Sequence, residues 1–338
     1  FVRKLLVIRF SALGDVAMLV PVVRQLAQAN TEWDITVLSR KQTAALWNDM
    51  PENVHFFGAD LKGQHQGMNG LRQLLKDIDY KQFDKVADMH DVLRSRFLTR
   101  RFRLAGIPVK TILKGRWQKW LLVHRSTIIG QRMQRLLPNT LASTISRYED
   151  VLTRLGFSFR QGSVRMAEQH LNNTFITPLS HLTDREMIGE KCGIGIAPFA
   201  AHKGKIYPLD KMEEVVRQLS EQVAEPIYLF GAGDSEKAVL EDWEKKYKGV
   251  ISLVGKQKMD KEIAIMRGLR LMLTMDSSNM HLASLAGTRV ISIWGATHPK
   301  AGFLGYGQHT EDCIQLDLPC RPCSIYGNKP CKFGDWRC

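Results

Sequence analysis

The strongest constraint on the fold of this chain is a repeated alternation of short apolar runs with longer amphipathic segments. In the first half, the apolar runs lie near residues 4–10, 34–38, 53–57, 84–88 and 109–113. A second series follows near residues 192–197, 226–230, 250–253, 271–275 and 289–294. Apolar residues at helical spacing predict helices between most of these runs, including helices near residues 209–222, 235–247, 260–268 and 279–286. Because parallel neighbours need long connections, the alternation predicts an α/β protein with parallel sheets.

The two series predict two similar domains in tandem, which suits a length of 338 residues. The alternation loosens through the polar stretch Asn172-Asn173-Thr174, where we place the linker. We therefore expect an N-terminal α/β domain at 1–170, a linker at 171–185 and a C-terminal α/β domain at 186–338. A cleft between two such domains is the usual place for a ligand.

The composition is that of a globular protein, with 44% hydrophobic and 24% charged residues. No apolar run approaches the ~18 to 20 residues that span a membrane, so we expect a cytoplasmic protein. The chain begins with Phe1 and ends at Cys338, and we expect the natural protein to continue at both ends.

The net charge of +14 is confined to the first half of the chain. Residues 1–165 hold 27 basic and 13 acidic residues, whereas residues 166–338 hold 21 of each. Between Asp91 and Glu149 there are thirteen basic residues and no acidic one. Such a field attracts nucleic acid, an anionic membrane surface, or a phosphorylated or carboxylated substrate. The ordinary alternative is a solvated basic surface.

The stretch from Leu5 to Val16 predicts a buried strand, a tight turn and the start of a helix, and it carries Ser11, Gly14 and Asp15. A carboxylate at a helix start can cap free backbone N–H groups and complement the helix dipole. The carboxyl ends of strands also border the ligand crevice of open α/β sheets, so Asp15 is also placed where it could act on a substrate. These residues alone leave both interpretations open.

Two loops of the second half are candidates for holding phosphate. The first carries Lys203 and Lys205 directly after a strand, where lysines can neutralise a diphosphate. The second is the turn Gly231-Ala232-Gly233, which lacks the third glycine of a dinucleotide fingerprint. Solvent-exposed lysines and an ordinary turn are the alternatives.

A third candidate phosphate site follows the buried strand near 271–275. Ser277 and Ser278 fall at a helix start, where free N–H groups and the helix dipole favour an anion. His281 would lie about one turn inside that helix, where a histidine is most often structural.

Four motifs in order along the chain resemble the ADP-heptose:lipopolysaccharide heptosyltransferases of glycosyltransferase family 9. They are Arg9-Phe10-Ser11-Ala12-Leu13-Gly14-Asp15, Lys205-Ile206-Tyr207-Pro208, Asp276-Ser277-Ser278-Asn279-Met280-His281-Leu282-Ala283 and Trp294-Gly295-Ala296-Thr297. The resemblance implies a GT-B architecture, in which two Rossmann-like domains with parallel sheets face a central cleft. It also implies an inverting, metal-independent transfer of heptose from ADP-heptose to the Kdo/heptose inner core of lipopolysaccharide, with no further cofactor.

The same resemblance assigns roles to individual residues. Asp15 matches the general base that takes the proton from the acceptor hydroxyl. In the C-terminal, donor-binding domain, Lys205 matches the lysine on the donor diphosphate, Asp276 is expected to contact the sugar, and Glu236 falls near the nucleotide ribose. The full set expected to bind the donor is Lys205, Glu236, Asp276, Ser277, Ser278 and His281, with the role of His281 open.

The N-terminal domain is expected to bind the acceptor, through Ser11, Arg94, Arg96 and Arg116. The basic segment fits an acceptor that carries Kdo carboxylates and lipid A phosphates. The expected partners are therefore a nucleotide sugar, an anionic lipopolysaccharide core acceptor and the inner face of the inner membrane, which a monomer contacts peripherally without binding nucleic acid.

The sequence also departs from the usual motifs of the family. Phe199-Ala200-Ala201 stands where a pair of hydroxyl-bearing residues is common, and Ser277-Ser278 replaces Thr-Gly. These changes leave two alternatives open: a related GT-B transferase with another sugar nucleotide or acceptor, and a non-catalytic protein that binds a polyanion.

Five of the six cysteines raise separate expectations. Cys320, Cys323, Cys331 and Cys338 form a four-thiolate set near the end of the chain, and such a set suits tetrahedral zinc. Redox-active or incidental thiols are the alternatives, since stable disulfides are rare in a reducing cytosol. Cys192 opens a predicted strand and is expected in the core.

Overall fold

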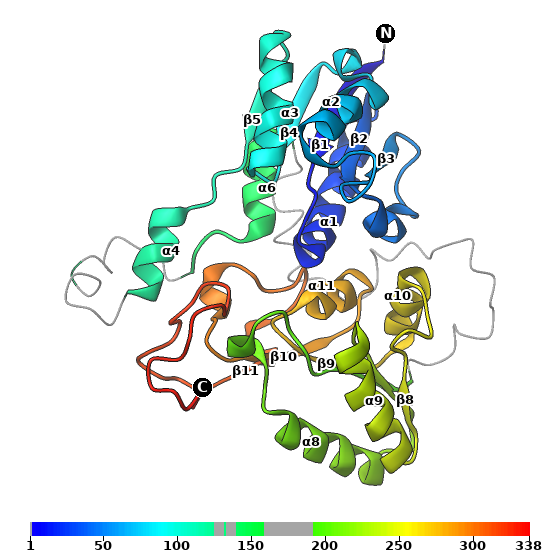
Figure 1. Cartoon of the computed structure of the whole chain (residues 1–338), viewed down its shortest axis with the longest axis vertical. Coiled ribbons are helices and arrows are strands. Elements are labelled where there is room, and N and C mark those ends of the chain that lie inside the picture. Colours follow the sequence, from blue (N-terminus) through cyan, green and yellow to red (C-terminus); the bar gives the residue numbers. More distant parts are fainter. Residues whose placement is uncertain (1, 125–131, 133–139, 159–191) are drawn as a thin grey trace. The chain divides into compact units, whose positions relative to one another are not determined.

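A computed structural model of the chain describes residues 2–124, 132, 140–158 and 192–338 (Figure 1). The expected linker at 171–185 lies outside these residues. The chain forms two compact units. Unit 1 comprises Phe1–Lys114 and Thr144–Met166, and unit 2 comprises Gly115–Ser143 and Ala167–Cys338. Within the described residues, no helix is both long and apolar enough to cross a membrane.

Unit 1 is built on a five-stranded sheet in which all neighbouring strands are parallel, in the order β3-β2-β1-β4-β5. Its strands are β1 (Arg3–Ile8), β2 (Trp33–Arg40), β3 (Val54–Ala59), β4 (Lys85–Asp88) and β5 (Val109–Thr111). Its helices are α1 (Leu13–Ala29), α2 (Gly67–Asp77), α3 (Leu93–Leu104) and α6 (Thr144–Thr153). All five strands lie where the sequence predicts them.

Strand β1 is central, and its residues 5–8 are completely buried. Leu6 and Ile8 point to one face of the sheet, where they form a core cluster with residues of α2 and α3, among them Leu74 and Leu98. Helices α1 and α6 pack against each other. Helix α1 contacts β2, and α6 contacts β4 and β5. Burial on both faces explains why β1 reads as an uninterrupted apolar run.

Unit 2 contains a six-stranded parallel sheet in the order β11-β10-β9-β6-β7-β8. Its strands are β6 (Ile194–Ala197), β7 (Ile227–Leu229), β8 (Val250–Ser252), β9 (Leu271–Met275), β10 (Val290–Trp294) and β11 (Cys313–Gln315). Its helices are α4 (Arg116–Val123), α8 (Leu209–Gln222), α9 (Asp234–Lys246), α10 (Met259–Gly268) and α11 (Ser278–Leu285).

Three features of unit 2 differ from the sequence expectations. Strand β11 is not predicted, because it is a three-residue edge strand whose last two residues are exposed. Cys192 is exposed and precedes β6, so its expected place in the core is wrong. Residues 115–143 were expected with the N-terminal domain but group with unit 2, where Leu122 of α4 and Leu141 cluster with Ala301.

Each sheet reverses its strand order at one point, and this point locates the candidate site. In unit 1 the reversal lies between β1 and β4, and in unit 2 it lies between β6 and β9. Ligands of open α/β sheets bind at the carboxyl ends of the strands beside such a reversal. Residues 9–15 and 88–91 occupy that edge in unit 1, and residues 198–205 and 276–278 occupy it in unit 2.

Candidate active site

Asp15 lies in the first turn of α1, directly after the carboxyl end of β1. Its Oδ2 atom accepts a hydrogen bond from the backbone N–H of Ala12 at 3.2 Å and forms an ion pair with the Arg9 guanidinium. The Asp15 side chain is 24% exposed, whereas that of Arg9 is 9% exposed. Asp15 therefore caps the helix, as one interpretation predicts, and still presents a carboxylate to solvent at the switch point.

Arg9 and Tyr148 fix the surroundings of this carboxylate. The Arg9 Nη1 donates to the carbonyl of Met89, and its guanidinium lies over the Tyr148 ring at 5.8 Å. The Tyr148 hydroxyl, contributed by α6, donates to the backbone carbonyl of Asp15 at 3.1 Å. The side chain and backbone of Asp15 are thus both held by buried groups of the same unit.

A second polar group stands at the end of β4. Buried Asp88 accepts hydrogen bonds from the backbone N–H groups of His90 and Asp91 and from the Ser95 hydroxyl, at 2.9 to 3.0 Å. Burial raises the pKa of the Asp88 carboxyl, although these hydrogen bonds oppose the shift. The Nε2 atom of His90 lies 3.3 Å from the Ser11 hydroxyl oxygen. The end of β4 therefore orients Ser11, one of the expected acceptor residues.

His90 should make unit 1 sensitive to acid. Burial first, and the nearby Arg9 charge second, lower its pKa from 6.5 to about 3. Between these values the unfolded chain binds a proton that the folded chain does not, so stability falls as the pH falls. Urea unfolding measures the free energy of unfolding at pH 7 and at pH 4.5. The drop in this free energy between the two pH values should be about 2 to 3 kcal/mol smaller in His90→Gln than in the wild type.

The matched control for the acid response is His55→Gln, because the side chain of His55 is 57% exposed. That variant should lose as much stability as the wild type between the two pH values. An equal loss in His90→Gln and the wild type would contradict the assignment to His90.

The expected acceptor residues do not all belong to one unit. Arg94 and Arg96 are exposed near the start of α3 in unit 1, and the Nε of Arg96 pairs with Asp91 Oδ1 at 2.7 Å. Ser11 belongs to the same unit, whereas Arg116 begins α4 in unit 2.

In unit 2 the two most specific donor candidates contact each other. Lys205 follows β6 and Asp276 follows β9, and these strands are neighbours in the sheet. The Lys205 Nζ lies 2.9 Å from Asp276 Oδ2, with side chains that are 16% and 3% exposed. The structure thus places a largely buried ion pair at the switch point of unit 2.

The remaining donor candidates lie at helix starts or inside a helix. Ser277 precedes α11 in an extended conformation, and its hydroxyl lies 3.3 Å from that of Thr274, while Ser278 opens the helix. The first N–H groups of a helix lack intrahelical partners, so this end of α11 suits an anion. His281 is buried within the same helix.

Glu236 has a structural contact that the sequence did not predict. Its Oε2 accepts a hydrogen bond from the backbone N–H of Ala232 at 2.7 Å, which closes the turn Gly231-Ala232-Gly233 onto the first turn of α9. The carboxylate therefore stabilises the glycine turn at the end of β7.

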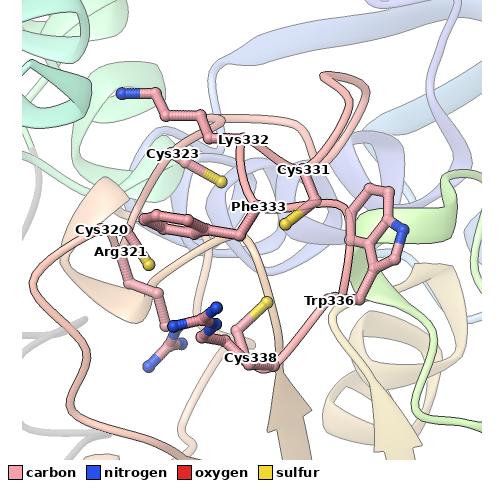
Figure 2. A pocket seen from close by; sticks show the side chains of 9 residues that line it. Cys320, Arg321, Cys323, Cys331, Lys332, Phe333, Trp336 and Cys338 are labelled. Atoms are coloured by element: carbon pink, nitrogen blue, oxygen red, sulfur yellow. The ribbon is translucent and has the colours of Figure 1, made fainter.

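The four C-terminal cysteines line one pocket, together with the side chains of Arg321, Lys332, Phe333, Trp336 and Arg337. Figure 2 shows that the sulfur atoms of Cys320, Cys323, Cys331 and Cys338 face the same space. All four are free thiols. Across the part of the chain that the structure describes, no three His, Cys, Asp or Glu side chains are arranged to hold a metal ion. The arrangement therefore gives no support to the zinc hypothesis.

Sequence analysis missed Arg9, Asp88 and His90 as parts of the candidate site. The available signal was position, because Arg9 follows β1 and residues 88–90 follow β4, next to the switch point.

The chain is similar in sequence to proteins of one known family. A sequence model described as glycosyltransferase family 9 (heptosyltransferase) matches residues 71–333. The lipopolysaccharide core heptosyltransferase OpsX of Haemophilus influenzae is 23% identical over 309 residues, which cover 88% of this chain and 80% of that relative.

Two solved structures share the fold. A family 9 glycosyl transferase from Veillonella parvula has a TM-score of 0.65 at 19% identity and covers 93% of this chain and 86% of its own. The E. coli heptosyltransferase WaaC with ADP-2-deoxy-2-fluoro heptose has a TM-score of 0.64 at 15% identity and covers 94% of each chain. The expected GT-B class, with a parallel sheet in each of two units, is confirmed.

Proposed function

The chain belongs to glycosyltransferase family 9, the heptosyltransferases, and on that premise we propose that it transfers heptose from ADP-heptose to the inner core of lipopolysaccharide. The observation that carries this proposal is the partly exposed Asp15 carboxylate at the switch point of unit 1. The substrate class is taken from the relatives, which are named for lipopolysaccharide core transfer and for a complex with an ADP-heptose analogue.

The acceptor step needs a base, and Asp15 fills that role. Its carboxylate takes the proton from the attacking hydroxyl while the hydroxyl oxygen bonds to the anomeric carbon of the heptose. The bond from that carbon to the diphosphate oxygen breaks, and its electron pair leaves with ADP. Attack from the face opposite the leaving group inverts the anomeric centre. Arg9 and Tyr148 hold Asp15 in place for this step.

The donor step needs positive charge near the leaving diphosphate. Lys205 supplies an ammonium group, and the N–H groups at Ser277 and Ser278 supply a helix start, so the charge that grows on ADP can be stabilised without a metal ion. An ammonium group has three N–H donors, so Lys205 can keep its bond to Asp276 and still bind a phosphate oxygen.

The other donor residues contact the sugar and the nucleoside in this proposal. Asp276 accepts hydrogen bonds from heptose hydroxyls, and Glu236 reaches the ribose from the start of α9. His281 is buried within α11, about one turn beyond the helix start that binds the diphosphate in this proposal.

The acceptor is anionic, and the basic residues of the first half of the chain match it. Arg94 and Arg96 on α3, together with Ser11 of the same unit, bind its carboxylates and phosphates. The protein works as a monomer at the cytoplasmic face of the inner membrane, where the acceptor displays these groups.

Calorimetric titration with ADP, UDP and GDP tests the donor assignment and separates it from polyanion binding. ADP should bind most tightly and should keep its preference over UDP as the salt concentration rises. A tighter complex with UDP or GDP would move the proposal to another sugar nucleotide. Equal binding of all three that falls log-linearly with salt would indicate a simple polyanion site.

A further inference from the structure

The end of the chain packs directly on the loop that carries Lys205. The carbonyl oxygen of Gly327 and the ring of Trp336 would lie 2.7 and 2.9 Å from a Cβ atom placed on Gly204. The Nζ of Lys203 lies 5.8 Å from the centre of the Trp336 ring. The cysteine-bearing tail, residues 320–338, therefore covers the backbone of the candidate donor loop.

Gly327 has a specific relation to the Lys205 side chain. A Cβ atom on Gly327 would lie 2.6 Å from Lys205 Cγ and 3.4 Å from both Cδ and Cε. The methylene chain of Lys205 thus lies along the backbone of Gly327, at a distance that only glycine permits. Gly327 also has a φ of +74°, in the region that favours glycine.

The tail is attached to the sheet by buried hydrogen bonds. Arg321, which is almost completely buried, donates from Nη2 to the carbonyl oxygens of Trp294 and Thr297 at 2.9 Å. The backbone N–H of Cys323 donates to the carbonyl of Ala296 at 3.2 Å, and the N–H of Ala296 donates to the carbonyl of Gly204 at 2.7 Å. A continuous set of bonds therefore joins the tail, the end of β10 and the loop of Lys205.

We propose that the parts of the C-terminal tail that pack on the Lys205 loop, at Gly327 and Trp336, belong to the donor site. In this proposal Gly327 is a positioning residue, which aligns the Lys205 side chain with Asp276 and presents its ammonium group to the donor diphosphate. The inference rests on the proposed function, because it takes Lys205 as the diphosphate ligand.

The physical basis is the flexibility of lysine. Ordering a free lysine side chain costs conformational entropy, because its flexible four-carbon stem has many rotamers. Contact with Gly327 along the methylene chain, and with Asp276 at the ammonium end, orders Lys205 before the donor arrives. A donor that meets an ordered lysine binds more tightly than one that must order it.

The test compares Gly327→Ala with Gly334→Ala. Gly334 lies in the same tail with a φ of +75°, and nothing lies within 4 Å of a Cβ placed on it. Both substitutions carry the same backbone strain, but only the first displaces Lys205. Gly327→Ala should weaken ADP binding and raise the KM for ADP-heptose by about 10-fold, with kcat changing far less, whereas Gly334→Ala should stay within about twofold of the wild type.

A double variant shows whether Gly327 acts through Lys205. In a Lys205→Met background, Gly327→Ala should weaken ADP binding no further, because the group that it positions is gone. A further loss in the double variant, or wild-type ADP binding in Gly327→Ala, would overturn the inference. If Gly327→Ala does not fold, ADP binding is measured with Trp336→Ala instead. This variant removes the packing of the tail on Gly204 without adding atoms, and it should also weaken ADP binding. Unchanged ADP binding in that variant would also overturn the inference.

ADP binding by Lys205→Met and Gly327→Ala distinguishes the role of Lys205 as diphosphate ligand from the positioning role of Gly327. Loss of ADP binding in Lys205→Met with none in Gly327→Ala rejects the positioning role and leaves the donor assignment intact. Wild-type ADP binding in Lys205→Met rejects Lys205 as the diphosphate ligand, and the positioning role falls with it.

Discussion

Replacing Asp15 by asparagine should lower kcat for heptose transfer by a factor of about 10³, with little change in the KM for ADP-heptose. Asparagine keeps the size of the side chain and an oxygen that can accept the N–H of Ala12, so the start of α1 is retained. It cannot take a proton from the acceptor hydroxyl, and general-base catalysis contributes about 10²- to 10⁴-fold. Steady-state kinetics with purified protein measure both constants.

The control for the Asp15 experiment is Asp210→Asn, which removes another carboxylate from the first turn of a helix, α8. That variant should keep kcat within about twofold. Asp15→Asn also removes the negative charge that pairs with buried Arg9, so thermal unfolding of each variant is needed to separate catalysis from stability. A folded Asp15→Asn protein that retains a tenth or more of the wild-type kcat would contradict the role of Asp15 as base.

Replacing Lys205 by methionine should weaken ADP binding by about 10- to 150-fold. Hydrogen bonds to charged groups contribute about 1.5 to 3 kcal/mol, and methionine keeps the apolar length of lysine without its charge. The variant should also lose stability, on the order of 3 to 5 kcal/mol, because the carboxylate of Asp276 remains buried without its partner. Calorimetric titration with ADP and urea unfolding measure the two effects.

Two further variants separate donor binding from stability at Lys205. Lys203→Met removes an exposed lysine from the same loop and should change ADP binding by less than about threefold. Asp276→Asn in the Lys205→Met background removes the second buried charge and should recover much of the lost stability without recovering ADP binding. Wild-type ADP affinity in that stable double variant would rule out Lys205 as a diphosphate ligand.

Much of this architecture could be predicted because parallel strands leave a strong local signal. Strands β1 and β6 are buried on both faces, so they appear as continuous apolar runs, and their order along the chain predicts two sheets. The proximity of Lys205 and Asp276 follows the same logic, because Lys205 lies in the loop that follows β6 and Asp276 comes directly after the neighbouring strand β9. The place of Asp15 after β1 makes it a candidate for the same reason, but the choice between a cap and a base rests on the resemblance to the family.

Other contacts depend on residues that are distant in the sequence, and local pattern does not reveal them. Arg9 joins Asp15 to Met89 and Tyr148, which lie 80 and more than 130 residues away. Gly327 lies in an irregular segment of the tail, where no repeating pattern of apolar residues gives a prediction. Its contact with Lys205 depends on the path of the tail. The place of α4 in unit 2 likewise depends on packing against Ala301.

Heptose transfer itself is measured most directly by mass spectrometry of the acceptor. Wild type and Asp15→Asn are each incubated with ADP-heptose and a chelator, using one Kdo–lipid A acceptor without heptose and one that carries a single heptose. The wild type should add one heptose to one of the two acceptors, at a rate that the chelator does not change, and Asp15→Asn should add none. A wild-type protein that binds ADP but adds heptose to neither acceptor would contradict the proposed heptosyltransferase activity.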